Sequence, residues 1–361
     1  MKLKRFAVGF IAAVMAFAVL GTPLGDILPF VRESVATTAG AESYGDYTYR
    51  LRTDSELTGT IEITGYSGNN SELKIIDNIN GNPVTRLADN AFKNCKNLTK
   101  VVVPDSVVNM GDYVFYGCVN LDEINIPDDM NYIGKYSFDN TKILNNQSET
   151  LKYIGNWVID CKNVEDVSIK NGTRGIAGRA FEYCTKLKNI IIPEGVVRIS
   201  VDAFYYCSNL TSITLPDSLK YISWYAFGWC TNLESITIPS GVTWVGDDAF
   251  AYCRKLKSIS IPQGVSQISH WIFYDCTNLE SITIYDGIEF IGIYAFYDCT
   301  KLKEIAIPSS VKSIQKYAFA YCRSLQNVVL PRSVTSLGEK AFLNCSSLET
   351  ITIPDLSLIH I

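Results

Sequence analysis

One 23-residue pattern repeats along most of the chain and constrains the fold more than any other feature. It is clearest in residues 210–232, LTSITLPDSLKYISWYAFGWCTN, and it recurs in residues 233–255, LESITIPSGVTWVGDDAFAYCRK. Written as a template, the pattern is LxxIxIPxxVxxIGxxAFxxCxx. Its Phe and Cys positions return at Phe92/Cys95, Phe115/Cys118, Phe181/Cys184, Phe204/Cys207, Phe227/Cys230, Phe250/Cys253, Phe273/Cys276, Phe296/Cys299, Phe319/Cys322 and Phe342/Cys345. A fixed period of this length is typical of stacked structural units.

The residue types in the template predict one layer of such a stack. The LxxIxI segment alternates apolar and polar residues, which favours a short half-buried strand. The following Pro cannot continue a strand ladder, so the chain turns there. VxxIG predicts a second short extended segment, and AFxxC predicts a helical turn with Ala, Phe and Cys pointing inward. Because about eight buried side chains cannot offset the ordering cost of one layer, we expect each layer to depend on its neighbours.

These AFxxC units resemble the BspA-like branch of bacterial leucine-rich repeats, whose 23-residue units end in AFxxC. The resemblance covers about residues 91–355. It implies an α/β solenoid: a right-handed, curved leucine-rich repeat array with a parallel β-sheet on its concave side and short helical turns. It also implies a secreted or surface-attached bacterial protein of a kind often discussed as an adhesin. Fold transfers well by such a resemblance, whereas function transfers poorly.

The first 41 residues have the features of an export signal. Residues 1–5 are basic, residues 6–20 are apolar, and Ala39-Gly40-Ala41 supplies small residues for cleavage, with Ala36 as an earlier alternative. The rival interpretation is a retained membrane anchor, but the apolar run is shorter than the roughly 20 residues that span a bilayer. We therefore expect a secreted or cell-surface protein whose mature chain has no membrane span.

Two stretches depart from the template. Residues 42–91 contain alternating and apolar runs without the AFxxC period, and we interpret them as an N-terminal cap on the first layer, with a separate ligand-binding module as the alternative. Within the repeat solenoid, residues 92–355, one repeat is irregular near residues 139–163, where ILNNQSET interrupts the period. This irregular repeat is either a decayed unit with a surface loop or a loop built for a partner.

The last six residues, 356–361, do not continue the template. They read LSLIHI, which matches a translation of a transposon-end adaptor used in sequencing libraries. We therefore expect this segment to be an artefact, and a C-terminal anchor or partner module to be missing from this fragment.

The cysteines raise the question of disulfide bonds in an exported chain. The sequence has 11 Cys, an odd number, and each unit places one at the same inward position. Cys in such a position behaves as a small buried hydrophobic residue. We therefore expect free buried thiols, although stacked Cys would be close enough to form bridges. No CxxC pair occurs, so we expect no metal site.

Catalytic and nucleic-acid-binding functions have little support in the sequence. The only His before residue 356 is His270, and no GxSxG, HExxH or phosphate-binding Gly loop occurs. We therefore expect no enzyme, no catalytic residues and no cofactor. The net charge of −5 and the lack of a basic patch argue against a nucleic-acid partner.

Two repeated surface patterns are the candidate binding residues. The outward positions of the first strand form a hydroxyl floor, which consists of Ser212, Thr214, Ser235, Thr237, Ser258, Ser260, Ser281 and Thr283. The positions between Phe and Cys form an aromatic rim, which consists of Tyr206, Trp229, Tyr252, Tyr274, Tyr297 and Tyr321. A second aromatic set, including Trp224 and Trp244, lies just before the AF pairs. The alternatives are structural: Ser and Thr suit a crowded sheet face, and neighbouring rings can stack on one another.

These patterns predict an exported, non-catalytic binding protein. We expect an adhesin-like leucine-rich repeat protein that engages an extracellular protein or glycan on a host or bacterial surface. The alternatives are a carbohydrate-binding accessory module of a larger extracellular assembly and a passive structural spacer.

Overall fold

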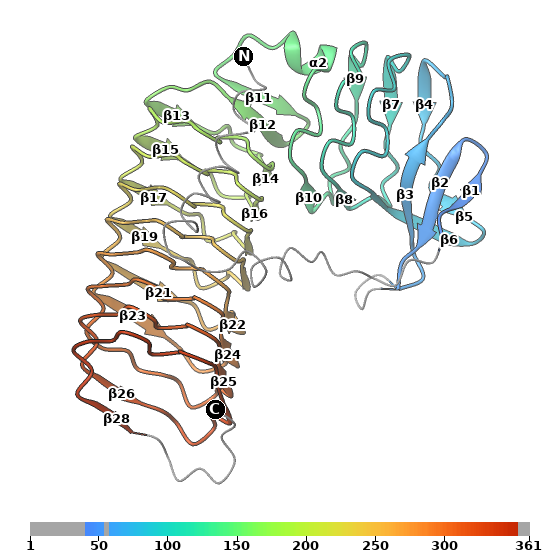
Figure 1. Cartoon of the computed structure of the whole chain (residues 1–361). Helices are drawn as coiled ribbons and strands as arrows, with labels where there is room; N and C mark the ends of the chain where they lie inside the picture. Colours follow the sequence, from blue (N-terminus) through green and yellow to red (C-terminus); the bar gives the residue numbers. More distant parts are fainter. Residues whose placement is uncertain (1–39, 54–57, 353–361) are drawn as a thin grey trace.

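The computed structural model describes residues 40–53 and 58–352. They form a solenoid of about 13 turns in which parallel strand ladders run along the stack (Figure 1). Most of the expected export signal and the expected artefact at residues 356–361 lie outside the described residues.

Two strands recur in most layers, as the template predicts. The first-strand ladder is formed by the LxxIxI segments and their N-terminal equivalents: β4 (Glu72–Lys74), β7 (Lys100–Val102), β9 (Glu123–Ile124), β13 (Asp166–Ser168), β15 (Asn189–Ile191), β17 (Ser212–Thr214), β19 (Ser235–Thr237), β21 (Ser258–Ile261), β23 (Ser281–Ile284), β26 (Asn327–Val329) and β28 (Thr350–Thr352). Parallel pairing places Ile213 opposite Ile236 and Ile259 opposite Ile282. The predicted parallel solenoid is therefore confirmed.

The VxxI segments form a second-strand ladder beside the first. Its strands are β6 (Asn82–Leu87), β8 (Asn109–Met110), β10 (Tyr132–Ile133), β12 (Trp157–Cys161), β14 (Gly175–Ile176), β16 (Arg198–Ile199), β18 (Tyr221–Ile222), β20 (Trp244–Val245), β22 (Gln267–Ile268), β24 (Phe290–Ile291), β25 (Ser313–Ile314) and β27 (Ser336–Leu337). In Figure 1 this ladder lies on the side of the C-terminal stack that faces the N-terminal stack. The first-strand ladder, which was expected on a concave side, lies on the outer side.

The N-terminal end is closed by antiparallel strands that the template does not contain. Strands β1 (Glu42–Tyr44), β2 (Tyr47–Leu51) and β3 (Ile61–Tyr66) pair in sequence, and β3 then pairs in parallel with β6. Strand β5 (Asn78–Ile79) pairs with β6 as a short hairpin. Tyr49, Ile61 and Ile63 are buried in the same hydrophobic core as Phe92.

The helical turns expected at AFxxC are wrong. Among the described residues the only α-helix is α2 (Lys142–Asn145), which lies outside the AFxxC segments. In a typical layer Asp202 and Tyr206 have left-handed backbones, with φ of 56° and 62°. The N–H of Phe204 donates to the carbonyl of Ala226 in the next layer at 2.8 Å. A helix requires consecutive right-handed residues bonded within one segment, so the left-handed residues and the bonds between layers exclude it.

The core is a column of stacked Phe rings that is interrupted once. Ring centroids in successive layers lie 4.8 to 5.8 Å apart from Phe92 to Phe138 and again from Phe181 to Phe342. The hairpin of β11 (Leu151–Ile154) and β12 occupies the interruption. It divides the interior into an N-terminal and a C-terminal core.

The hairpin acts as a wedge because its two faces pack on different cores. Ile154 and Trp157 belong to the N-terminal core, whereas Leu151 and Val158 belong to the C-terminal core. The two residues between its strands include Gly155, whose φ of 59° suits a tight turn. Because the wedge separates the layers here, the solenoid bends at this point (Figure 1).

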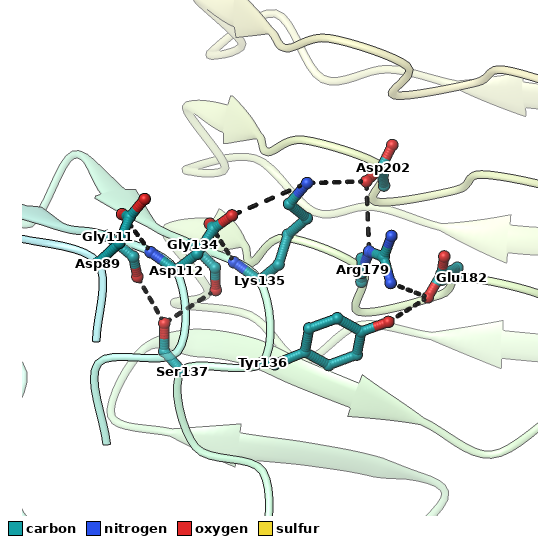
Figure 2. A network of polar contacts seen from close by, with 10 residues as sticks. All are labelled: Asp89, Gly111, Asp112, Gly134, Lys135, Tyr136, Ser137, Arg179, Glu182 and Asp202. Carbon is teal, nitrogen blue, oxygen red and sulfur yellow. Dashed lines mark hydrogen bonds and ion pairs between the residues drawn. The ribbon is translucent and has the colours of Figure 1, made fainter. Parts of the chain in front are cut away.

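At one corner of the bend the two stacks touch directly. The N–H of Gly178 donates to the carbonyl of Ile133 at 3.0 Å. Beside it, Figure 2 shows a polar network in which Lys135 Nζ lies 3.5 Å from a carboxylate oxygen of Asp202, and Arg179 lies 3.3 Å from the same oxygen. The Lys135–Asp202 pair joins one stack to the other, whereas Arg179 and Asp202 both belong to the C-terminal stack.

Candidate functional site

The hydroxyl floor is assembled as the sequence predicts. All eight Ser and Thr side chains are exposed, on strands β17, β19, β21 and β23. Parallel register places Ser212 beside Ser235 and Thr214 beside Thr237, with Ile213 buried between the two columns. The result is an uncharged surface four layers long that presents hydroxyl groups at the spacing of adjacent strands. It lies on the outer side of the bend (Figure 1).

The aromatic rim is largely a stack of rings. Trp229 and Tyr252 stack with centroids 4.0 Å apart, and Tyr206 stacks on Trp229 at 5.7 Å. Stacked rings cover one another's faces, so mainly ring edges remain for a ligand. The rim is therefore in good part a structural ladder that stabilises contacts between layers.

Two rim residues expected to be exposed are buried. Tyr274 and Tyr297 are only 7% and 8% exposed, and their parallel rings lie 4.9 Å apart. They form a separate small apolar cluster with Ala251 and Ala320 of neighbouring layers, where the small side chains leave room for the rings. Tyr206, Trp229, Tyr252 and Tyr321 remain at least partly exposed.

Three other aromatic residues are more accessible than the rim. Trp224 is 51%, Trp244 38% and Tyr285 50% exposed, and none of them has an aromatic stacking partner among residues 40–53 and 58–352. Trp224 lies over Gly246, where any side chain would collide with the indole. Tyr285 was not among the residues predicted to bind, although the Tyr at a position that holds Pro in other layers was a signal in the sequence.

Trp244 stands in an outward column of the second-strand ladder with Tyr221 and Arg198. Parallel register aligns the three residues, while Ile199 and Ile222 beside them are fully buried. The Arg198 guanidinium lies 4.0 Å from the Tyr221 ring centroid, a cation–π contact that holds both side chains. This column gives the inner side of the bend a mixed aromatic and cationic character.

His270 has a structural role in the ladder of layers. Its Nδ1 accepts the N–H of Ile293 at 2.9 Å, and its own N–H donates to Asp247 at 2.9 Å. Asp112 accepts the N–H of Lys135 at the equivalent position of an earlier layer. His270 therefore does what an Asp does at this position in other layers: it accepts the hydrogen bond of a backbone N–H from the next layer.

Burial dominates the ionisation of the neighbouring carboxyls. It raises the pKa of Asp247 and raises that of Asp248 well above its ordinary value. Asp248 also carries a hydrogen bond from Tyr225, which favours the ionised form but does not outweigh desolvation.

The cysteines form a column of hydrogen-bonded thiols. All eleven are free, and eight of them donate S–H to the carbonyl of the Phe one layer earlier at 3.0 to 3.3 Å, as Cys207 does to Phe181. Burial raises the pKa of Cys230 to about 12. Each of these carbonyls also accepts the backbone N–H of the Cys three residues later in its own layer, as Phe181 does from Cys184 at 3.0 Å. The S–H therefore adds a second hydrogen bond, which a disulfide would lose because it has no S–H to donate.

In the described part of the chain no group of three or more His, Cys, Asp and Glu is placed to hold a metal ion. Residues 40–53 and 58–352 contain no helix that is both long and apolar enough to cross a membrane.

Comparisons with solved structures find bacterial leucine-rich repeat proteins. A leucine-rich repeat protein from Bacteroides ovatus is 27% identical over 86% of this chain and 94% of its own, with a TM-score of 0.38. A leucine rich cell surface protein from Faecalibacterium prausnitzii is 27% identical over 89% of this chain and 96% of its own, with a TM-score of 0.41. No curated protein matches.

The family comparison agrees with the repeated template. The model of the BspA type leucine rich repeat region matches in overlapping segments, at residues 85–211, 154–279, 197–307 and 243–361. Together these segments cover residues 85–361, well over half of the chain. The chain therefore belongs to the BspA type leucine-rich repeat family.

Proposed function

We propose that this chain is an exported, non-catalytic binding protein that holds a macromolecule of a host or bacterial surface against the hydroxyl floor. The observation that carries the proposal is the floor itself, eight exposed, uncharged hydroxyl side chains held in register within the strand pairs β17–β19 and β21–β23. Family membership supports a binding or adhesin role at the bacterial surface. The basic and apolar residues of the first 20 positions support export.

A rigid floor favours binding because little conformational entropy is lost on association. Its strands are fixed by parallel pairing of β17 with β19 and of β21 with β23, and the hydroxyls both donate and accept hydrogen bonds. An extended protein segment or a glycan chain along the stack could meet equivalent hydroxyls in successive layers. We therefore propose an extracellular protein or glycan as the ligand class.

A carbohydrate-binding accessory role is the second candidate, and the exposed Trp pair favours it. Trp224 and Trp244 lie on the second-strand side with unstacked rings, and such faces suit the apolar faces of sugar rings. This candidate places the ligand on the inner side of the bend, whereas the floor places it on the outer side. Variants on each side therefore distinguish the two.

The test screens immobilised matrix proteins and polysaccharides against the wild type and three variants. Ser235→Arg/Ser258→Arg fills the floor with charge, whereas Ser235→Thr/Ser258→Thr keeps the hydroxyls as the matched control. Trp224→Ala/Trp244→Ala removes the ring pair. We expect the Arg variant to weaken binding about tenfold or more and the Thr variant to retain it.

The possible results separate the proposals. If only the Trp224→Ala/Trp244→Ala variant lost binding, the ligand site would be the exposed Trp pair and not the hydroxyl floor. Equal binding by the wild type and the Arg variant would overturn the floor as the ligand surface. Circular dichroism of each variant checks that the stack is intact.

A further inference from the structure

Strand β13 is an open end of the first-strand ladder. It pairs with β15 on one side. The preceding first strand, β9, pairs only with β7, so no strand of the described chain occupies the other edge of β13. The wedge hairpin causes this gap, because it separates the layers that would otherwise pair. An open strand edge is a template for pairing with another segment.

Hydrogen bonds show which residues of this segment face β15. The Glu165 carbonyl accepts the N–H of Asn189 at 3.2 Å. Four residues later, the N–H of Ile169 donates to the carbonyl of Ile191 at 3.0 Å. In a parallel ladder alternate residues direct their N–H and C=O to opposite neighbours. The odd-numbered residues therefore bond toward β15.

The even-numbered residues face the open edge. Lys170 confirms the alternation, because its N–H donates to the Tyr153 hydroxyl of the hairpin at 3.1 Å. By the same alternation, the N–H and C=O groups of Asp166 and Ser168 point away from β15. Both residues are exposed. Two backbone donors and two acceptors are thus aligned as a strand partner would require.

A hollow lies along this edge. It has a volume of about 590 Å³. One wall is β13 with Lys170, and the other is the irregular segment at residues 147–153. Gln147 braces that wall, since its amide bonds both the N–H and the carbonyl of Tyr153 at 2.8 Å. These two bonds hold the second wall in place beside β13.

The charges that line the hollow indicate the chemistry of its occupant. Glu149 and Asp166 are both exposed and both line it. The cation of Lys170 is already engaged, because its Nζ lies 4.0 Å from the Tyr153 ring centroid. The hollow is thus lined by two carboxylates and by one amine that already contacts a ring. This negative balance favours a basic side chain in the ligand.

We propose that the open edge of β13 binds an extended peptide segment with basic side chains, which adds to the first-strand ladder as a strand. Backbone hydrogen bonds to Asp166 and Ser168 supply the affinity, and Glu149 and Asp166 select the basic side chain. This site is separate from the hydroxyl floor and does not depend on the function proposed for it. It gives the irregular repeat a binding role.

The test measures fluorescence anisotropy of labelled six-residue peptides with the full chain. The probe is acetyl-KTITVK-amide, and its controls are acetyl-ETITVE-amide and a copy of the probe N-methylated at its central amides. Ser168→Pro removes the outward N–H but leaves the bonds to β15, because Pro is tolerated at a strand edge whose N–H is unpaired. Ser168→Ala keeps the N–H as the matched control.

We expect the basic probe to bind, and Ser168→Pro or N-methylation to weaken it about tenfold or more. Ser168→Ala should bind like the wild type, the acidic peptide should bind more weakly, and added salt should reduce the difference between the peptides. Thermal melting checks that Ser168→Pro is folded, and if it is not, the N-methylated probe decides alone.

Several results would overturn the proposal. These are no binding of the basic probe, equal binding of the N-methylated probe, or equal binding of the acidic peptide. Hydrogen exchange gives a further outcome: protected amides at Asp166 and Ser168 in the free protein would mean that this chain or a second copy already fills the edge.

Discussion

The regular C-terminal layers and the bend pack their interiors in different ways. In the regular layers each contact is repeated, as in Phe227, Phe250 and Phe273, whose neighbouring rings lie 5.5 and 5.8 Å apart. At the bend the contacts occur once, and Trp157 of the wedge fills the space between unlike neighbours. Contacts that repeat from layer to layer therefore allow the stack to continue in one direction, whereas a single inserted hairpin changes the direction of the stack.

Removing the Trp157 side chain should have the largest effect on the stability of the bend. The side chain is fully buried. Trp157→Ala should therefore lower the free energy of unfolding by about 3–5 kcal/mol. Because the ring joins the wedge to the N-terminal core, we also expect the two stacks to unfold in separate steps. Urea unfolding followed by circular dichroism measures both effects, and one transition with an unchanged midpoint would contradict them.

Phe250→Ala is the matching change in a regular layer. It should also cost about 3–5 kcal/mol, since it leaves a cavity between two stacked rings. Here the layers on both sides are alike, so we expect one cooperative transition for the C-terminal stack. Denaturant unfolding checks this, and normal stability would show that the Phe column is not the core.

Gly175→Ala tests how tightly the wedge is packed. A Cβ at Gly175 would collide with the Trp157 ring. We expect a loss of about 1–3 kcal/mol from overpacking. Gly228→Ala is the control, because the nearest atoms to a Cβ there lie 3.2 Å away, against 2.4 Å at Gly175. Equal melting temperatures for the two variants would mean that the wedge is loose.

Lys135→Ala removes an ion pair across the bend. The side chains of Lys135 and Asp202 are 27% and 10% exposed, against 52% and 59% for the surface pair Lys188 and Glu165. We expect Lys135→Ala to cost about 1 kcal/mol, and Lys188→Ala less, because exposed pairs are screened by water. Chemical denaturation of both variants gives the comparison, and a larger loss for Lys188→Ala would reverse it.

Asp248→Asn should have the smallest effect on stability, and unlike the other variants it should stabilise the fold. A carboxyl whose pKa is higher in the folded than in the unfolded protein stabilises the fold in full below the unfolded pKa, which is about 3.9. That stabilisation is lost as pH rises through the folded pKa. Asn cannot ionise, so we expect a higher melting temperature at pH 7 and little change near pH 3. Melting curves across this range check the sign, and destabilisation at pH 7 would show that Asp248 is held as a needed anion.

The candidate sites were predictable to different degrees. The Ser and Thr of the floor could be placed because alternation in a strand fixes which side chains point outward. The burial of Tyr274 and Tyr297 could not, because it depends on Ala251 and Ala320 in other layers. The open edge of β13 was visible only as a break in the period.

The sequence by itself determined the repeated layer. Apolar residues at fixed template positions select the inward side chains, so the Ile, Phe and Cys columns and the parallel register follow from the 23-residue period. Tertiary structure decided the rest. The AFxxC backbone bonds to the next layer instead of forming a helix. The bend depends on Trp157 meeting residues that do not repeat, and such contacts between distant segments leave no periodic signal.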